Sequence, residues 1–250
     1  GYTMITVIYL DNKDAVGLDT QYRGDSIVTY RGYSGTVAIR NINYISDVEN
    51  IVPGENIYIE VTDTDRNTKV GIDNVRVIIS SIVSGSVIDT ESLIIDEING
   101  DLGIFRGSIA TELNDRIVGD GKLQLIGNAI ISIQYYDLVD ATSVMGQLKF
   151  DTSRVDDTGV IRIVSDTSGS GSDVSTIIIG DTIYLQVEDS DLDTSDNKDL
   201  VVVTIQAGSG DSELVTLIQV SKHSRIFTGL IYTSQGNATG YNGTLELPGY

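Results

Sequence analysis

The sequence has no cysteine and no tryptophan, and only two prolines, three phenylalanines and one histidine in 250 residues. Without cysteine the chain can form no disulfide, no thiolate metal site and no cysteine nucleophile. Basic residues are also scarce: 16 Lys and Arg face 36 Asp and Glu, and the formal net charge is −20. This balance argues against a nucleic-acid partner, which needs clustered Lys and Arg for its phosphates, and it makes cations the expected ligands.

Long apolar runs are missing as well. No run approaches the roughly 20 residues that a membrane-spanning helix needs, so no transmembrane segment is expected. The chain opens without a basic and then apolar leader, and an exported protein of this sequence is expected to be in its mature form. Isoleucine and valine are prominent, and 40% of the residues are hydrophobic with 26 glycines. This composition favours a globular all-β protein.

The sequence contains two copies of one repeat. Residues 1–11 resemble residues 127–137, and two further pairs share that spacing of 126, namely 54–65 with 180–191 and 73–79 with 199–205. Farther along, residues 104–107 match 226–229 and 121–125 match 243–247 at a spacing of 122. The change of spacing indicates that one hairpin is shorter in the second copy.

Apolar residues alternate with polar ones in runs bounded by Gly, Asp, Asn and Ser, which is typical of half-buried antiparallel strands. The first copy predicts strands near residues 3–10, 34–40, 55–62, 74–82, 91–97, 104–110 and 121–125, and the next strand near 129–136. About seven short strands per copy predict two tandem immunoglobulin-like β-sandwich domains, the second of which lacks its closing strand. The expected divisions are a donor strand at 1–11, connections at 12–33 and 138–157, a first sandwich at 34–137 and an incomplete second sandwich at 158–250.

Three short motifs carry a family resemblance. A strand of the form G-D-x-I-x-x-x-V-x-D-x-D begins at Gly180, an I-F-x-G strand begins at Ile226, and a G-x-L-x-L-P-G strand begins at Gly243. In these motifs the chain resembles the immunoglobulin-like repeats of archaeal and some bacterial surface-layer and extracellular filament proteins. The resemblance implies an extracellular location at the cell surface and a structural role.

The incomplete second sandwich suggests how copies of the chain associate. A sandwich without one strand has unpaired backbone edges and an apolar groove that a free strand can fill. Residues 1–11 match the strand that closes the first sandwich, so we expect them to insert into the second sandwich of an adjacent subunit. Such a head-to-tail contact does not close and generates a homopolymeric filament. Four residues of the donor strand are expected to face inward, Thr3, Ile5, Val7 and Tyr9, and three to face outward, Met4, Ile8 and Leu10.

Other interpretations remain open at this stage. The strand at residues 1–11 could instead close a two-domain monomer, or the termini could be boundaries within a longer array. A surface adhesin, a carbohydrate-binding stalk or a surface-layer fragment is the alternative function. An enzyme is not expected, because no catalytic motif accompanies the single histidine, His223, which is interpreted as a surface-turn residue.

Two acidic loops are candidate calcium sites. They place oxygen side chains at alternate positions just after a strand, Asp63, Asp65 and Asn67 with Asp73 in the first repeat, and Asp189, Asp191 and Asp193 with Asp199 in the second. Ca²⁺ takes about six to eight oxygen ligands, which such loops can supply. The alternative is a solvated acidic turn whose Asp and Asn side chains bind local backbone N–H groups.

Two tripeptides match the acceptor pattern for N-glycosylation. They begin at Asn237 and Asn242, which are followed by Ala-Thr and Gly-Thr respectively. Attached glycans are therefore a possible modification of an extracellular chain.

Overall fold

The computed structural model describes residues 2–13, 17, 19–30, 32–68, 70–100, 102–142 and 144–249. This part of the chain is all-β, as the sequence predicts, and its one helical element is the 3₁₀ turn η1 (Thr64–Arg66). In the two strands nearest the N-terminus, side chains are described at residues 4–11 and 22–27, so the inward position expected for Thr3 lies outside the described side chains. None of the described helical structure is long and apolar enough to cross a membrane.

The strands form three sheets. The first is an antiparallel hairpin of β1 (Tyr2–Lys13) and β2 (Asp19–Tyr30). The nine-stranded sheet contains β3 (Thr36–Arg40), β4 (Asn50–Ile51), β5 (Asn56–Thr62), β6 (Asn74–Val83), β7 (Ser86–Glu97), β8 (Ile104–Leu113), β9 (Lys122–Leu125), β10 (Ile130–Val139) and β11 (Met145–Val155). The six-stranded sheet contains β12 (Val160–Val164), β13 (Thr182–Glu188), β14 (Leu200–Gln206), β15 (Ser212–Gln219), β16 (Ile226–Gln235) and β17 (Thr244–Leu247).

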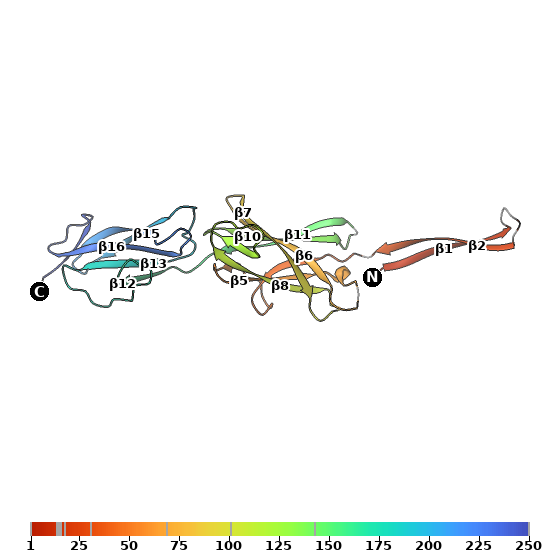
Figure 1. Ribbon diagram of the computed structural model, residues 1–250, viewed down its shortest axis with the longest axis horizontal. Coiled ribbons are helices and arrows are strands. Elements are labelled where there is room, and N and C mark those ends of the chain that lie inside the picture. The colour runs from red at the N-terminus through yellow and green to blue at the C-terminus, as the bar shows by residue number, and fades with distance from the viewer. Residues whose placement is uncertain are drawn as a thin grey trace.

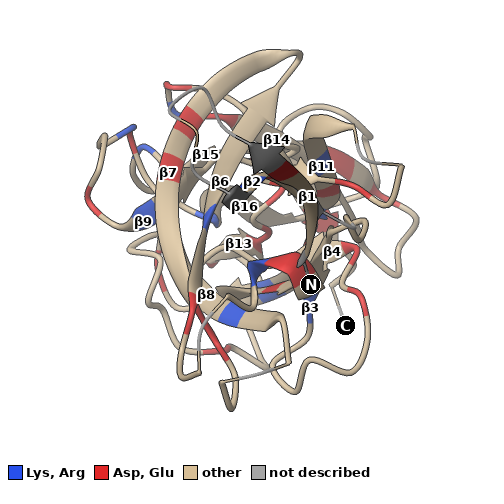
Figure 2. Cartoon of the chain, turned by 90° about the vertical axis from the view of Figure 1, so that its right-hand side faces the viewer, with Lys and Arg blue, Asp and Glu red and all other residues tan. Residues whose placement is uncertain are grey.

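The three sheets follow one another along an elongated molecule. The β1–β2 hairpin extends from one end, the six-stranded sheet lies at the other end, and the nine-stranded sheet lies between them (Figure 1). Viewed from the hairpin end, acidic residues occur on strands and loops around the whole outline (Figure 2). The high negative charge is therefore distributed over the surface.

The nine-stranded sheet curls until its two ends meet. Its order is β3-β5-β8-β7-β6-β10-β11-β4, with β9 joined to β8, and β3 contacts both β10 and β11. The enclosed core contains alternate residues of each strand, among them Ile39, Ile59, Val77, Phe105 and Ile133. This period-2 burial gives a sandwich-like arrangement with one polar face per strand.

The six-stranded sheet has the order β12-β13-β16-β15-β14, with β17 joined to β16. It surrounds a second and smaller core that contains Ile183, Leu185, Leu217, Phe227 and Leu245. Each core is assembled from its own strands, and no buried residue belongs to both in the described part of the chain.

Equivalent backbone contacts confirm the sequence repeat. Gly54 and Gly180 precede β5 and β13 with φ angles of +96° and +100°, a conformation that glycine adopts without strain. The N–H of Gly54 donates to the hydroxyl of Thr111 at 3.0 Å, and the N–H of Gly180 donates to the hydroxyl of Thr233 at 2.9 Å. The two copies therefore share their turns as well as their strands.

The two segments expected to be connections contain strands. Residues 12–33 include β2, and residues 138–157 include β11, whose last residue Val155 belongs to the first core. Both strands were missed because few of their residues are buried: in β11 only Ser153 and Val155 are. A strand in which neither surface is strongly buried lacks the apolar alternation by which strands are recognised.

Truncation of one matched phenylalanine in each core tests whether the cores are separate. Phe105 and Phe227 are both fully buried, so each change to alanine should cost about 3–5 kcal/mol of local stability. We expect Phe105→Ala to lower the unfolding midpoint of the nine-stranded sheet alone and Phe227→Ala that of the six-stranded sheet alone. Calorimetry with hydrogen exchange measures this, and an equal loss of protection in both sheets would contradict it.

Candidate assembly and cation sites

The β1–β2 hairpin exposes apolar side chains on both faces. Its two strands pair only with each other in the part of the chain that the structure describes. The exposed residues of β1 are Ile5, Val7 and Tyr9 on one face and Met4, Ile8 and Leu10 on the other. An apolar two-stranded ribbon is marginally stable in water by itself, and an exposed patch of this kind marks an interaction surface.

The hairpin repeats the register of a second hairpin inside the nine-stranded sheet. Met4 pairs with Val28, and Ile130 of β10 pairs with Arg154 of β11, each 126 residues farther along. The same shift relates all the pairs that the two hairpins share. The β1–β2 hairpin is thus the counterpart of the β10–β11 hairpin over both strands.

The β10–β11 hairpin completes the nine-stranded sheet. β10 pairs with β6 on one side and β11 on the other. Its residues Ile131, Ile133 and Tyr135 are buried, and so is Ala129 just before the strand. β11 lies against β3, where the carboxylate of Asp151 accepts the N–H of Ile39 at 2.7 Å.

The six-stranded sheet has no such hairpin beside β14. β14 pairs with β15 and with no other described strand. Its core-facing residues Val201, Val203 and Ile205 are half-exposed, whereas their counterparts in β6, which are Val75, Val77 and Ile79, are buried. The free edge of β14 therefore presents both unpaired backbone groups and apolar side chains.

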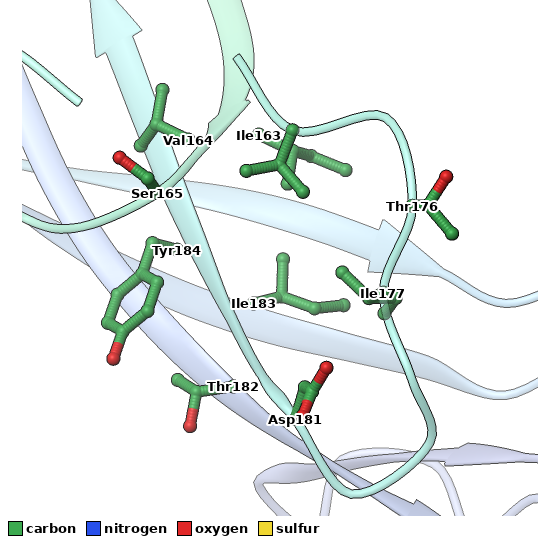
Figure 3. A pocket seen from close by; sticks show the side chains of 10 residues that line it. Ile163, Val164, Ser165, Thr176, Ile177, Asp181, Thr182, Ile183 and Tyr184 are labelled. Carbon is green, nitrogen blue, oxygen red and sulfur yellow. The ribbon is translucent and has the colours of Figure 1, made fainter. Parts of the chain in front are cut away.

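The other end of the six-stranded sheet is uncovered in the same way. Ile161 and Ile163 of β12 are 60% and 41% exposed, although they pair with the buried residues of β13. Their counterparts in β3, Val37 and Ile39, are 8% and 0% exposed beneath β10 and β11. Ile163 lines an open cleft of about 300 Å³ together with Ile177 and Ile183 (Figure 3).

The first acidic loop is held by protein hydrogen bonds. Asp63 is buried, and its carboxylate accepts the hydroxyl of Tyr135 and the N–H of Asp65. Burial, reinforced by the bond to the Asp65 carboxyl, raises the pKa of Asp63 to about 7. The carboxylate of Asp73 accepts the N–H and the hydroxyl of Thr68 at 2.8 and 3.0 Å. Asn67 donates its backbone N–H to Thr64 after η1.

The second acidic loop has a related arrangement. The hydrogen bond that Asp191 shares with the carboxyl of Asp189, together with burial, raises the pKa of Asp191 to about 6. Asp193 is buried and accepts the amide of Gln219 at 2.8 Å; burial raises its pKa. Asp199 accepts the N–H of Thr194 at 2.9 Å. In each loop two carboxyls therefore lie in contact, Asp63 with Asp65 and Asp189 with Asp191. The carboxylates of Asp73, Asp193 and Asp199 accept hydrogen bonds from other residues.

His223 has a role that the sequence did not indicate. Its ring is largely buried, with Nδ1 3.2 Å from the carboxylate of Asp193 and Nε2 3.0 Å from that of Asp115 in the first repeat. Lys222 also pairs with Asp115. The contacts with Asp115 join the two sheets between residues that are 107 and 108 positions apart in the sequence. Local sequence patterns cannot predict contacts at such a separation.

The two glycosylation acceptors lie on the surface of the six-stranded sheet. Asn237 and Asn242 are both exposed. The side-chain N–H of Asn242 donates to Glu246 at 2.9 Å, so this amide is engaged, whereas Asn237 is placed in the exposed turn after β16.

The raised pKa of Asp63 gives a pH dependence that can be measured. The ordinary pKa is 3.8, so between pH 4 and 7 the folded chain holds a proton that the unfolded chain has lost. Stability must then fall as pH rises through this window, by up to about 1.4 kcal/mol per pH unit, and level off above pH 7. We expect Asp63→Asn to remove this decline and to be the more stable form at pH 7.

The measurement is the unfolding midpoint of the nine-stranded sheet for both proteins from pH 4 to 8 in a chelator. Parallel curves would contradict the prediction. Repeating it with Ca²⁺ tests the metal prediction, because a cation held by Asp63 and Asp65 would restore the stability of the wild type at pH 7 and leave Asp63→Asn unchanged.

Comparison with known proteins does not identify a relative. Neither family models nor curated protein sequences match this chain.

Proposed function

We propose that the chain is a non-enzymatic structural subunit of an extracellular filament that grows head to tail by donor-strand complementation. The donated element is the whole β1–β2 hairpin, whose first strand, Tyr2–Lys13, overlaps the donor strand expected at residues 1–11. The observation that carries this proposal is the identical register of the β1–β2 and β10–β11 hairpins. One of them completes a sheet, and the other has no sheet to complete among the described residues of its own surroundings.

The proposed architecture is two tandem immunoglobulin-like sandwiches, the second of which lacks a hairpin. The uncovered residues of β12 and β14 support this interpretation, because they occupy the positions that β10 and β11 cover in the nine-stranded sheet. A hairpin placed there would give β14 its second neighbour and cover both Ile161 and Ile163. These are the conditions under which strand addition is favoured.

The hairpin is expected to act between subunits. It lies at the end of the molecule opposite the six-stranded sheet, with the nine-stranded sheet between them (Figure 1). The contact therefore joins different surfaces of two copies, and a contact of this type propagates along a filament. The partner is a second copy of the same chain.

The internal hairpin predicts the register of the contact. Ile133 pairs with Ile79 and Tyr135 with Val77 between β10 and β6. Shifting these pairs by the spacing of 126 between the repeats places Val7 opposite Ile205, and Tyr9 opposite Val203, of the adjacent subunit. The two apolar pairs would then lie on the core side of the completed sheet.

Polar contacts of the internal hairpin have counterparts in the same register. The Tyr135 bond to Asp63 predicts that the hydroxyl of Tyr9 donates to Asp189 of the neighbour. β3 and β12 correspond at a spacing of 124, because Val37 pairs with Val61 and Ile161 with Val187. The 2.9 Å bond from the N–H of Gly35 to Asp137 therefore predicts a bond from Gly159 of one subunit to Asp11 of the next. The Asp151 bond to Ile39 similarly predicts a bond between Asp25 and the N–H of Ile163.

Such a contact is expected to dissociate slowly. Each Val, Ile or Tyr side chain that leaves water contributes about 1.5–3 kcal/mol, and the two strands add a row of backbone hydrogen bonds. The acidic loops remain proposed Ca²⁺ sites, and Asn237 and Asn242 proposed glycan sites, of a cell-surface filament. The exposure of Asn237 and Asn242 supports access by a glycan.

Disulfide cross-linking tests the function and its register together. The chain has no cysteine of its own, so a variant carrying Val7→Cys and Ile205→Cys contains only the designed pair. We expect oxidation to give a ladder of covalent multimers on a denaturing gel, because each bond joins two subunits. The matched control is Ile8→Cys with Ile205→Cys, which places the first thiol on the opposite face of the strand and should not cross-link.

Deletion of residues 1–30 provides the second arm. The truncated chain should remain discrete in solution and in electron micrographs, while the full chain forms filaments. A cross-linked monomer would indicate closure within one chain, and filaments that persist after the deletion would contradict donation by the hairpin. A discrete full-length chain would favour an adhesin or stalk module.

A further inference from the structure

Three buried carboxylates meet at the edge of the six-stranded sheet, away from both acidic loops. Asp211 precedes β15, Glu213 lies on β15 and Glu246 lies on β17. They are 1%, 1% and 8% exposed. One oxygen from each lies within 4.8 Å of the other two.

The protein satisfies this cluster with neutral donors alone, and incompletely. The carboxylate of Asp211 accepts the backbone N–H of Glu246 at 2.7 Å. Glu213 accepts the backbone N–H groups of Asn242 and Gly243 at 2.9 and 2.8 Å. Glu246 accepts the backbone N–H of Thr239 at 3.2 Å and the side-chain amide of Asn242 at 2.9 Å. The Oδ1 atom of Asp211 is buried and accepts no hydrogen bond from any described residue. None of the described Lys and Arg side chains forms an ion pair with the cluster. A buried oxygen left in this state is costly unless a further ligand reaches it.

The first repeat has the same site with a different charge. Asp89, Glu91 and Gln124 stand 122 residues before Asp211, Glu213 and Glu246. The backbone N–H of Gln124 donates to Asp89 at 3.2 Å, as that of Glu246 does to Asp211.

The first repeat carries its own cation. The guanidinium of Arg116 lies 3.8 Å from Asp89 Oδ1. This atom is equivalent to Oδ1 of Asp211, and neither oxygen accepts a hydrogen bond from a described residue. At the position of Arg116 the second repeat has Ala238, and at the position of Gln124 it has Glu246. One repeat thus has two carboxylates with an arginine, and the other has three carboxylates with no basic side chain.

We propose that the second repeat binds a calcium ion between Asp211, Glu213 and Glu246, where the first repeat uses Arg116. The ligands are all carboxylate oxygens, which suit a hard cation, and Ca–O distances of about 2.3–2.6 Å allow one ion to reach oxygens with this separation. Water completes the coordination from the side of the exposed Asn242 and Gly243. The ion neutralises the cluster and supplies a partner for Asp211 Oδ1.

Glu246→Gln tests the site by giving it the residue that the first repeat has. Equilibrium dialysis against Ca²⁺ alone should show one bound ion fewer per chain than in the wild type. In a chelator the variant should unfold at a higher temperature than the wild type, because one of three close negative charges is gone, and added Ca²⁺ should reverse that order. Dialysis counts ions equally well for discrete and polymeric protein, so the result is independent of assembly.

Two matched variants assign the ion to this cluster. Glu91→Gln changes the position in the first repeat that corresponds to Glu213 and should leave the number of bound ions unchanged. Asp189→Asn alters the acidic loop and should leave the response of Glu246→Gln unchanged. Two results would overturn the proposal: an equal number of bound ions in the wild type and Glu246→Gln, or an unfolding midpoint of the wild-type six-stranded sheet that does not change when Ca²⁺ is added.

Discussion

The pairing of β10 with β6 is the interaction on which the nine-stranded sheet depends. It supplies the hydrogen-bond partners of β6 on the side away from β7, places Ile131, Ile133 and Tyr135 in the core, and brings β11 to β3. Where this pairing is absent, beside β14, the same kinds of residue are half-exposed and β12 is uncovered. The contrast between two copies of one repeat shows what a single hairpin adds, because the strand order β3-β5-β8-β7-β6 recurs as β12-β13-β16-β15-β14.

Electrostatics follows the same comparison between repeats. Asp63 and Asp189 begin equivalent acidic loops, yet Asp63 has a tyrosine from β10 above it, and burial there raises its pKa. The cluster of Asp211, Glu213 and Glu246 differs from its counterpart by the loss of one arginine and the gain of one carboxylate. In a chain of net charge −20 such local differences decide where a proton or a cation is held.

Much of the fold could be predicted from the sequence. The alternation of apolar residues predicted most strands, and the spacing of 126 predicted which strands correspond. β2 and β11 were not predicted because few of their described side chains are buried, and β4 is too short to show a period. The acidic cluster was missed because Glu246 lies far along the chain from Asp211 and Glu213, and no local pattern joins it to them. The repeat could have indicated it, since Asp211, Glu213 and Glu246 correspond to Asp89, Glu91 and Gln124 at a single spacing of 122. His223 was predicted as a surface-turn residue. It lies in a turn, but its ring is largely buried, because its partner Asp115 becomes a neighbour only when the two sheets meet.

The shared register of the two hairpins also describes how a filament would be articulated. The β10–β11 hairpin directly precedes the six-stranded sheet, just as β1–β2 precedes the nine-stranded sheet. The β10–β11 hairpin belongs to the sheet before it, and in the proposed polymer the β1–β2 hairpin would belong to the six-stranded sheet of the adjacent subunit. In the proposed polymer every body would be linked to the next by the same joint, and only every second joint would be crossed by the polypeptide itself. The mechanical period of such a fibre is then half a subunit, and its weakest links under tension are the joints where the chain is not continuous.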